Sequence, residues 1–234
     1  MKKLLLLLSS ILISLNSYGG WFDKTICYVK DGQVRNGVIY LPNKTKPFTG
    51  NNLCKGKDSL ARGKIKNGMK DGKWLLWDFK NKMILNYKDG KLDGKNTEWY
   101  DNGNKKEETD FKDDKVDGKY TKWYYNGNKK EETDFKDDKI DGKEIYWDER
   151  GQKRSEGNYK DGKKDGNYTE WYDNGLKKYD INFKDEKKDG EYKKWDDAGK
   201  TIWKLVFKDD RCVDYSLSDY SFGCEGWMAW NSEN

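Results

Sequence analysis

The chain has 234 residues, of which 38% are charged and 34% belong to the hydrophobic set, against roughly a quarter charged in an ordinary soluble domain. This composition argues against one large aliphatic core, although 11 Trp and 16 Tyr supply rings that each bury on the order of 150–250 Å². The formal net charge of +5 is small for a chain of this length. It therefore does not point to a nucleic-acid partner.

The first 19 residues have the pattern of a secretory signal peptide. Lys2 and Lys3 precede an apolar run over residues 4–15, and the sequence Ser17-Tyr18-Gly19 offers small residues for cleavage after Gly19. A membrane span needs about 20 apolar residues, whereas this run has 12. We therefore expect residues 1–19 to be removed, no integral membrane span in the mature chain, and a periplasmic, cell-surface or secreted location.

Residues 20–49 are expected to form an N-terminal cap. This segment holds both prolines and Cys27, and its sequence is irregular apart from a partial repeat at residues 37–40 and 48–50. The regular array is expected over residues 50–208, because Gly50 stands 22 residues before the first glycine of the repeat pattern.

A repeat organises the array. The phrase NGNKKEETDFKDDK occurs twice, at residues 102–115 and 126–139, and the Asp-Gly pairs that follow such phrases are spaced by 22 residues once and by 24 residues four times. The glycines of these pairs are Gly72, Gly94, Gly118, Gly142, Gly166 and Gly190. The fifth residue after each glycine is a tryptophan: Trp77, Trp99, Trp123, Trp147, Trp171 and Trp195. A fixed period of this length predicts a repeat architecture.

Each unit is predicted to be one β-hairpin. Tyr120 and Lys122 alternate with Thr121 and Trp123 at the period of a strand, and Asn-Gly is a hairpin-turn signal. The outgoing strand is expected at about residues 119–124, the returning strand at about 129–135, and the connection to the next unit at 136–142. The sequence leaves open whether the Asn-Gly loop has two residues or a third, extra residue. The fold class is thus all-β, an elongated and twisted antiparallel sheet of consecutive hairpins.

Residues 209–234 break the period and are expected to form a C-terminal cap. All four cysteines lie outside the array, which favours disulfides in an exported chain. About 12 strands would separate the two ends by roughly 50–60 Å, but bridged Cα atoms lie within about 7 Å. The local pairs Cys27 with Cys54 and Cys212 with Cys224 are therefore favoured.

The tryptophan row is expected to be the core of the array, because little else could offset the entropy of the ordered chain. Trp123→Ala is then expected to cost on the order of 3–5 kcal/mol. Tyr100, Tyr124 and Tyr172 lie on the opposite pleat and are the candidates for an exposed binding face.

No catalytic, metal or cofactor site is expected. The chain has no histidine, which removes the commonest general base and metal ligand. Four aspartates recur immediately before the repeat glycines, where turn chemistry accounts for them: Asp117, Asp141, Asp165 and Asp189. A calcium-loop interpretation fails because Lys115 stands where an oxygen ligand is needed.

The aligned units resemble the MORN-repeat superfamily, in particular the bacterial MORN-variant repeats of the YwqK-type antitoxin family. The matching phrases are YKDGKLDG at residues 87–94, EWYDNG at 98–103, YKDGKKDG at 159–166, and the early GVIY and FTG at 37–40 and 48–50. The resemblance covers about residues 35–208. It implies an extended sheet of hairpins and an antitoxin that binds a cognate toxin. The signal peptide and cysteines depart from what a cytoplasmic antitoxin would need.

The sequence thus favours a non-enzymatic exported scaffold that binds a protein partner. The alternatives are an antitoxin or immunity protein, as the resemblance implies, and a surface glycan-binding module that stacks sugars on Tyr and Trp rings. Specificity is expected at positions that break the repeat, namely Glu144, Tyr146, Arg150 and Leu176, and in the two caps.

Overall fold

The computed structural model describes residues 24–78, 80–214 and 224. The predicted signal peptide over residues 1–19 and most of the predicted C-terminal cap lie outside these residues. The helix is α1 (Tyr28–Asp31). The strands are β1 (Thr25–Ile26), β2 (Gln33–Arg35), β3 (Val38–Tyr40), β4 (Gly50–Lys55), β5 (Leu60–Lys66), β6 (Met69–Trp77), β7 (Lys82–Lys88), β8 (Lys91–Leu92), β9 (Gly94–Trp99), β10 (Lys105–Lys112), β11 (Lys115–Trp123), β12 (Lys129–Lys136), β13 (Lys139–Trp147), β14 (Lys153–Lys160), β15 (Lys163–Trp171), β16 (Lys177–Lys184), β17 (Lys187–Trp195), β18 (Thr201–Lys208) and β19 (Arg211–Asp214).

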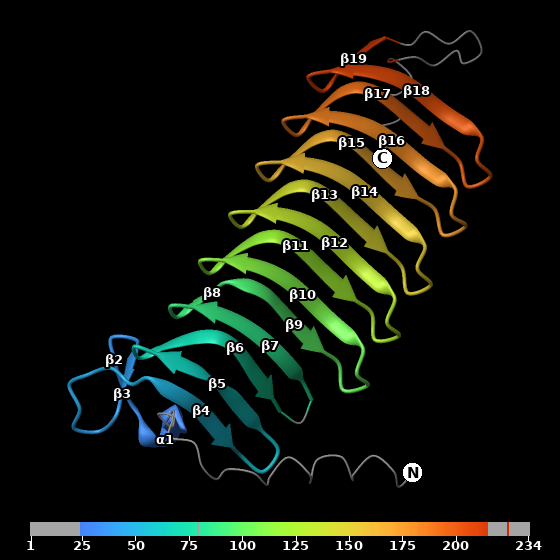
Figure 1. The fold of residues 1–234 in the computed structure, drawn as a ribbon. Coiled ribbons are helices and arrows are strands. Elements are labelled where there is room, and N and C mark those ends of the chain that lie inside the picture. The colour runs from blue at the N-terminus through green and yellow to red at the C-terminus, as the bar shows by residue number, and fades with distance from the viewer. Residues whose placement is uncertain (1–23, 79, 215–223, 225–234) are drawn as a thin grey trace, which may run out of the picture.

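The strands form one long sheet in which neighbours in sequence are neighbours in space. From β4 to β19 the strands pair antiparallel in chain order, while β1 adds to the edge of β4 in parallel. Figure 1 shows the hairpins side by side along a curved, twisted array, with β4 near one end and β19 at the other. The predicted all-β fold of consecutive hairpins is confirmed.

The turn between units is shorter than the sequence suggested. Lys112 pairs with Lys115, so the two residues Asp113 and Asp114 make the turn, with φ of 51° and 70°. This is the geometry of a type I′ hairpin, in which short polar residues tolerate positive φ. The expected connection over residues 136–142 is therefore wrong in extent, since β13 already begins at Lys139.

The repeated Asp-Gly pairs lie within strands and not at turns, which corrects the interpretation of Asp117, Asp141, Asp165 and Asp189. Between β10 and β11, Thr109 pairs with Tyr120 and Phe111 with Val116, so Asp110 alone faces residues 117–119. This irregularity is a β-bulge, and Gly118 supplies its φ of 120°. A Cβ there would come 2.9 Å from the Cβ of Asp110. The recurrent glycine is thus needed for a bulge.

The Asn-Gly loops have three residues. Tyr100 N donates to Asn104 O, and Gly103 N donates to Tyr100 O. Gly103 has a φ of 89°, so the loop is a type I turn followed by a left-handed glycine. Phe111 pairs with Gly94, five residues before Trp99, which places Phe111 and Trp99 on opposite faces of the sheet.

The two faces have different compositions. We call the face that carries Trp99, Trp123 and their equivalents the tryptophan face, and the opposite face, with Tyr120 and Phe135, the tyrosine face. The largest fully buried apolar side chains, Trp74, Ile65, Leu205 and Phe207, lie on the tyrosine face. The apolar core is thus on the tyrosine face.

The six tryptophans of the repeat do not form that core, and this expectation is corrected. Trp77 is 59% exposed, and the other five are half-buried. Trp123 stands three residues after Tyr120 in β11, so regular alternation puts the two side chains on opposite faces, and Phe135, which pairs with Gly118, shares the face of Tyr120. Those two rings contact each other edge to face, with centroids 6.1 Å apart.

Hydrogen bonds join each unit to the next along both edges of the array. Asp138 N donates to Val116 O, and Val116 N donates to Asp138 Oδ1. At the other edge, Tyr124 donates its hydroxyl to Trp147 O, and Asn126 donates its amide to Glu149 O. The repeated Tyr, Asn and Asp side chains therefore hold neighbouring hairpins in register.

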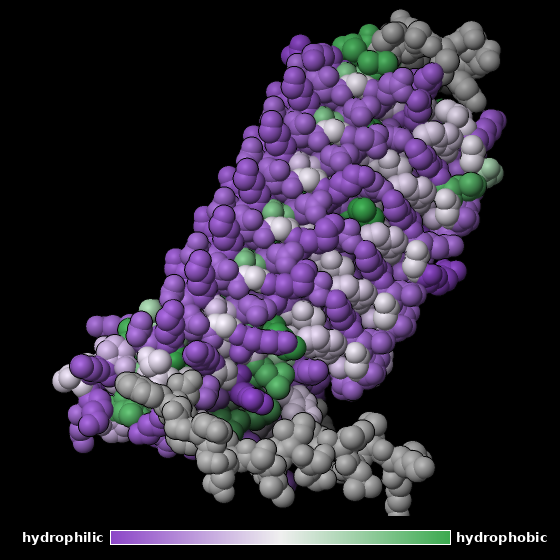
Figure 2. All heavy atoms as spheres, in the orientation of Figure 1, coloured by the Kyte–Doolittle hydropathy of each residue, from purple (hydrophilic) through white to green (hydrophobic). Residues whose placement is uncertain are grey.

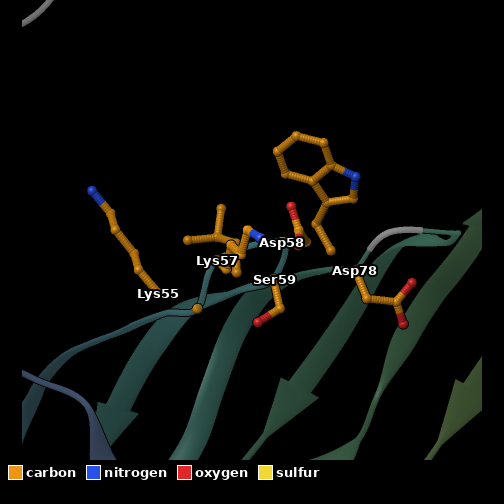
Figure 3. A pocket seen from close by; sticks show the side chains of 8 residues that line it. Lys55, Lys57, Asp58, Ser59 and Asp78 are labelled. Carbon is orange, nitrogen blue, oxygen red and sulfur yellow. The ribbon is translucent and has the colours of Figure 1, made fainter.

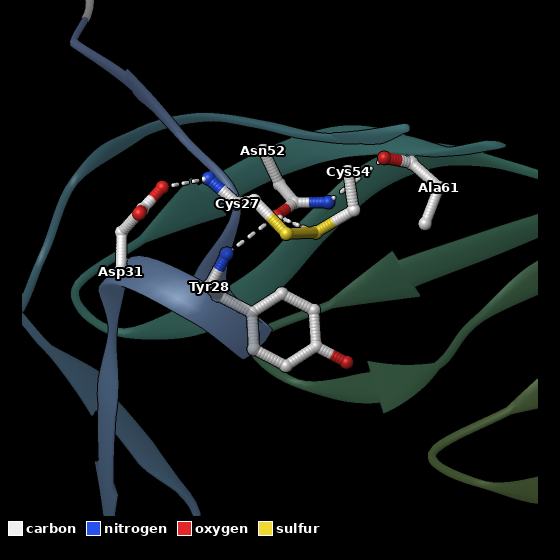
Figure 4. The surroundings of a disulfide bond; sticks show 6 residues. All are labelled: Cys27, Tyr28, Asp31, Asn52, Cys54 and Ala61. Atoms are coloured by element: carbon white, nitrogen blue, oxygen red, sulfur yellow. Dashed lines mark hydrogen bonds between the residues drawn. A yellow bond between two sulfur atoms is a disulfide. The ribbon is translucent and has the colours of Figure 1, made fainter. Parts of the chain in front are cut away.

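The N-terminal end has a conventional core. Buried Ile26, Ile39, Phe48, Ile65 and Trp74 form one cluster. The Cys27–Cys54 disulfide ties the segment before α1 to β4, and the buried Asn52 beside it accepts from Tyr28 N and donates to Ala61 O (Figure 4). Cys212 bonds to Cys224. Both local pairings expected from the sequence are present.

Candidate functional site

The tryptophan face carries a repeated contact between a lysine and a ring. Each lysine begins or precedes a returning strand, and its ammonium lies over a neighbouring indole. The pairs are Lys82 over Trp99 at 4.9 Å, Lys105 over Trp123 at 5.3 Å, Lys129 over Trp147 at 5.7 Å, Lys153 over Trp171 at 5.8 Å and Lys177 over Trp195 at 5.9 Å from the ring centroid. These are cation–π distances. The result is a row of half-exposed rings in which one side of each of these five rings is already occupied.

A carboxylate holds four of these lysines in place. Lys105 Nζ lies 2.5 Å from Glu108 Oε2, and Lys177 Nζ lies 2.7 Å from Asp180 Oδ2. Lys129 with Glu132 and Lys153 with Glu156 make the same pair. A second lysine reaches the other oxygen of the same carboxylate in three units, as Lys119 does at Glu132 over 3.0 Å.

These ion pairs change the titration of the carboxylates. The hydrogen bond from Lys129 is the main reason why the pKa of Glu132 is lowered, and Lys153 has the same effect on the pKa of Glu156. In two of these units the second lysine also contacts an aspartate, as Lys95 does with Asp110 and Lys119 with Asp134, so that two lysines meet two carboxylates. The central part of the tryptophan face is therefore charged but locally balanced.

The predicted binding tyrosines have a structural contact that the sequence did not indicate. Tyr100, Tyr124 and Tyr172 are half-buried, and each donates its hydroxyl to the carbonyl of the tryptophan 23 residues later, over 2.8–2.9 Å. They follow the last residue of their strands and lie at the loop edge, where they join one unit to the next. Their role in binding a partner stays a prediction.

The positions that break the repeat fall into separate places. Glu144 and Tyr146 lie on the tyrosine face, where Tyr146 donates its hydroxyl to Glu144 Oε1 over 3.1 Å. Burial raises the pKa of nearby Glu131. Leu176 is 42% exposed in a loop. The structure therefore does not bring these predicted specificity positions into one site.

The loop that contains Arg150 uses ion pairs where its neighbours use Tyr and Asn. Asp148 accepts from the backbone N–H groups of Arg150 and Gln152. Arg154 donates to Asp148 and to Asp173 of the next loop. The backbone hydrogen bond from Gln152 is the main reason why the pKa of Asp148 is lowered. This unit keeps the link to the following loop with a different chemistry.

The N-terminal end of the tryptophan face is hollowed. A groove of about 850 Å³ crosses β4, β5, β6 and β7, and the sequence did not reveal it. Beside it, a smaller hollow of about 400 Å³ is lined by the β4–β5 loop, Trp77 and Asp78 (Figure 3). Figure 2 shows a mostly hydrophilic face on which hydrophobic residues gather mainly towards this end. The hollows coincide with the least regular part of the array.

Nothing in the described residues has the arrangement of a metal centre. Within residues 24–78, 80–214 and 224 there is no group of three or more Cys, Asp or Glu side chains that could hold a metal ion. The helices of that same part of the chain include none that is long and apolar enough to cross a membrane.

Comparison with known proteins identifies the repeat. No curated protein matches the chain. Three successive segments, residues 92–113, 116–137 and 140–161, match the family model of the MORN repeat variant. Each segment runs from the end of one Asp-rich turn to the beginning of the next, and so includes one complete hairpin of the array. The central part of the chain is therefore built from three consecutive MORN repeat variants.

Proposed function

We propose that this protein is an exported, non-enzymatic scaffold that binds a protein partner along its tryptophan face. The observation that carries the proposal is the row of half-exposed tryptophans at one register of the array. Fully burying a large apolar side chain contributes about 1.5–3 kcal/mol, and these rings leave part of that free energy unused. Aromatic side chains that are only partly covered are typical of protein interfaces.

The contacts of the rings support a protein partner over a glycan. Sugar stacking needs an open ring face, but Lys105 lies over Trp123 and Lys129 over Trp147. Each lysine is also paired with a carboxylate. Rings bordered by paired charges fit the apolar centre and polar rim of a protein interface.

The proposal keeps the organisation expected from the sequence. Residues 1–19 would direct export, residues 20–49 and 209–234 would cap the ends, and residues 50–208 would present the binding face. The two disulfides support an oxidising location, because disulfides persist mainly in exported proteins. If the partner is a single toxin, the antitoxin role that the family resemblance implies becomes the specific form of this function.

Capture from the native cell envelope, followed by direct titration of the purified partner, tests the proposal. The variant Trp99→Ala/Trp123→Ala/Trp171→Ala should weaken binding at least tenfold. A control, Ile202→Ala, removes an exposed apolar side chain outside the row and the caps and should leave affinity unchanged. One stoichiometric toxin would establish the antitoxin role, whereas retention on envelope glycans without any protein would refute a protein partner.

A further inference from the structure

The groove at the N-terminal end of the tryptophan face has a cationic rim. Five exposed cations from four strands line it: Lys55, Arg62, Lys64, Lys73 and Lys82. No carboxylate is among the described residues that line the groove. Asp71 lies across from Lys64 on the neighbouring strand but is not among the lining residues. Asp58 and Asp78 line the adjoining hollow, and Asp78 already accepts from the backbone N–H groups of Lys80 and Asn81.

These five cations differ from the lysines of the repeats. Over the described part of the chain, none of the five takes part in an ion pair, whereas Lys95, Lys119 and Lys143 at the equivalent face of later units each contact a carboxylate. Lys82 alone has a ring contact, with Trp99. The positive charge of the array is thus compensated in the centre and uncompensated at this end.

The floor of the groove is apolar. Leu53 pairs with Arg62, Arg62 with Leu75, and Leu75 with Ile84, which makes one row across the four strands. Leu53, Leu75 and Ile84 are half-buried. Cations flank this row on both sides, because Lys82 lies two residues before Ile84 and Lys73 two residues before Leu75, on neighbouring antiparallel strands. The result is an apolar strip that is interrupted by Arg62 and lies between two cationic borders.

We propose that this groove binds an acidic, extended segment of the protein partner, with carboxylates at the cationic borders and apolar side chains on the central strip. The inference rests on the proposed scaffold function and specifies the partner's chemistry. A strand-like peptide places alternate side chains on opposite sides, so a peptide lying between the strip and one border can direct its carboxylates to that cationic border and its apolar side chains to the strip. Opposite charge would also speed association and make it sensitive to salt.

A protein segment fits the groove better than other anionic polymers. Single-stranded nucleic acids need a series of stacking rings beside the cations, whereas the described lining of the groove contains no aromatic residue and the exposed Trp77 lines the adjoining hollow. The same lack of rings argues against a stacked acidic glycan. The half-buried leucines and isoleucine supply instead a surface for aliphatic side chains.

Fluorescence anisotropy with a labelled 12-residue peptide of alternating Glu and Val tests the inference on the full chain with its disulfides intact. We expect saturable binding that weakens at least tenfold in Lys73→Glu/Lys82→Glu and falls with rising salt. The control Lys136→Glu/Lys160→Glu makes the same charge change at exposed strand ends outside the groove and should bind the peptide as the unchanged chain does. Circular dichroism verifies that both variants are folded.

Two further peptides separate the contribution of charge from that of apolar contact. A peptide with Gln in place of Glu should not bind, and one with Ser in place of Val should bind several-fold more weakly. Equal affinity for the Glu and Gln peptides, equal binding by both double variants, or tighter binding to sulfated polysaccharide or anionic vesicles than to the peptide would overturn the inference. If the peptide fails while the tryptophan variants still lose the captured partner, the scaffold function stands and the groove proposal alone is wrong.

Discussion

The N-terminal end of the array and its centre are stabilised in different ways. At the N-terminal end, Trp74, Ile65 and Phe48 belong to a buried apolar cluster next to a disulfide. In the centre, the fully or nearly buried side chains include Thr109, Thr121 and Thr133, and repeated hydrogen bonds join one unit to the next. A unit held by local, repeated contacts can be copied without redesigning a core. The N-terminal end is not repeated in this way, because its buried apolar cluster depends on a specific set of side chains.

The centre and the N-terminal end also differ in how their charged side chains are paired. In the centre, Glu132 and Glu156 each receive two lysines, whereas the groove over β4–β7 has cations without carboxylates among its described lining residues. Lys119 also contacts Asp134, so neighbouring hairpins of the centre lie side by side with little repulsion between their charges. Uncompensated charge is left where the repeat is least regular, and this difference indicates where recognition of a partner should be most selective.

The largest expected effect concerns the two kinds of tryptophan. Trp74 is 1% exposed, and its indole N–H donates to Lys64 O over 3.0 Å. Trp74→Ala should therefore lower the free energy of unfolding by about 3–5 kcal/mol. Trp123→Ala should cost only about 1–2 kcal/mol, because the ring keeps part of its surface exposed and realises roughly two-thirds of a transfer free energy of about 1.5–3 kcal/mol. Urea denaturation of each variant measures both values.

Two controls accompany this comparison. Trp77 is 59% exposed, so Trp77→Ala should change stability by less than about 0.5 kcal/mol. Gly63 lies against the Trp74 ring, and an added Cβ would come 2.2 Å from it, so Gly63→Ala should be destabilising. A loss for Trp123→Ala as large as that for Trp74→Ala would contradict the division between core and surface tryptophans.

The disulfides give the next largest effect. Cys27 and Cys54 are 27 positions apart in the sequence and Cys212 and Cys224 are 12 positions apart, and the entropy lost by the unfolded chain rises with loop length. Replacing Cys27 and Cys54 by Ser should cost about 3–4 kcal/mol, and replacing the second pair about 3 kcal/mol. Hydrogen exchange should localise the first loss to β4–β6. Uniformly increased exchange along the whole array would show that the N-terminal end is not a separate cooperative unit.

The sequence was sufficient to predict the fold because the period is explicit. Six tryptophans and six glycines at fixed spacing, together with alternating residues such as Tyr120 and Thr121, specify hairpins that pair in chain order. The local disulfides followed from the length of such an array. The fold and the disulfide pairing both depend on the spacing of residues along the chain, which folding does not change.

The positions of the turns and the face of the core were harder to predict. Asp117-Gly118 and Asp113-Asp114 are both turn-like pairs, and only the register shows that the first pair forms a bulge. The three-residue loop alone would pair Gly94 with Asp110, but the further offset at Lys106 pairs Gly94 with Phe111 and so puts Phe111 on the face opposite Trp99, since one inserted residue reverses a strand's sides. The groove depends on side chains from four strands, and no single segment of the sequence contains it.

A smaller effect tests the hydrogen bonds between units. Tyr124→Phe removes the hydroxyl that donates to Trp147 O over 2.8 Å, which should cost about 1 kcal/mol. Tyr100→Phe and Tyr172→Phe break the equivalent bonds and should have similar effects, because each bond joins one loop to the next. Thermal denaturation of the triple variant should show their combined effect. An unchanged triple variant would mean that the loop edge contributes nothing to the stability of the centre.

The smallest effect is the response to acid, and it should separate the centre from the N-terminal end. Lys129 and Lys153 lower the pKa of Glu132 and Glu156 in the folded chain. The stability that these pairs provide is fully present above the unfolded pKa of about 4.3, and it is lost as the pH falls through the lowered folded values. Burial raises the pKa of Glu131, which acts in the opposite direction but at a single position.

Hydrogen exchange measured at about pH 5 and at about pH 3, spanning the titration of these carboxylates, should therefore show a larger loss of protection in β11–β15 than in β5–β7. The variant Lys129→Met/Lys153→Met should reduce that difference, because the pKa values of Glu132 and Glu156 would return towards their ordinary range. The groove contains no carboxylate among its described lining residues, so its strands have little charge pairing to lose on acidification. Equal loss of protection in both regions would show that the ion pairs of the tryptophan face are too exposed to distinguish them.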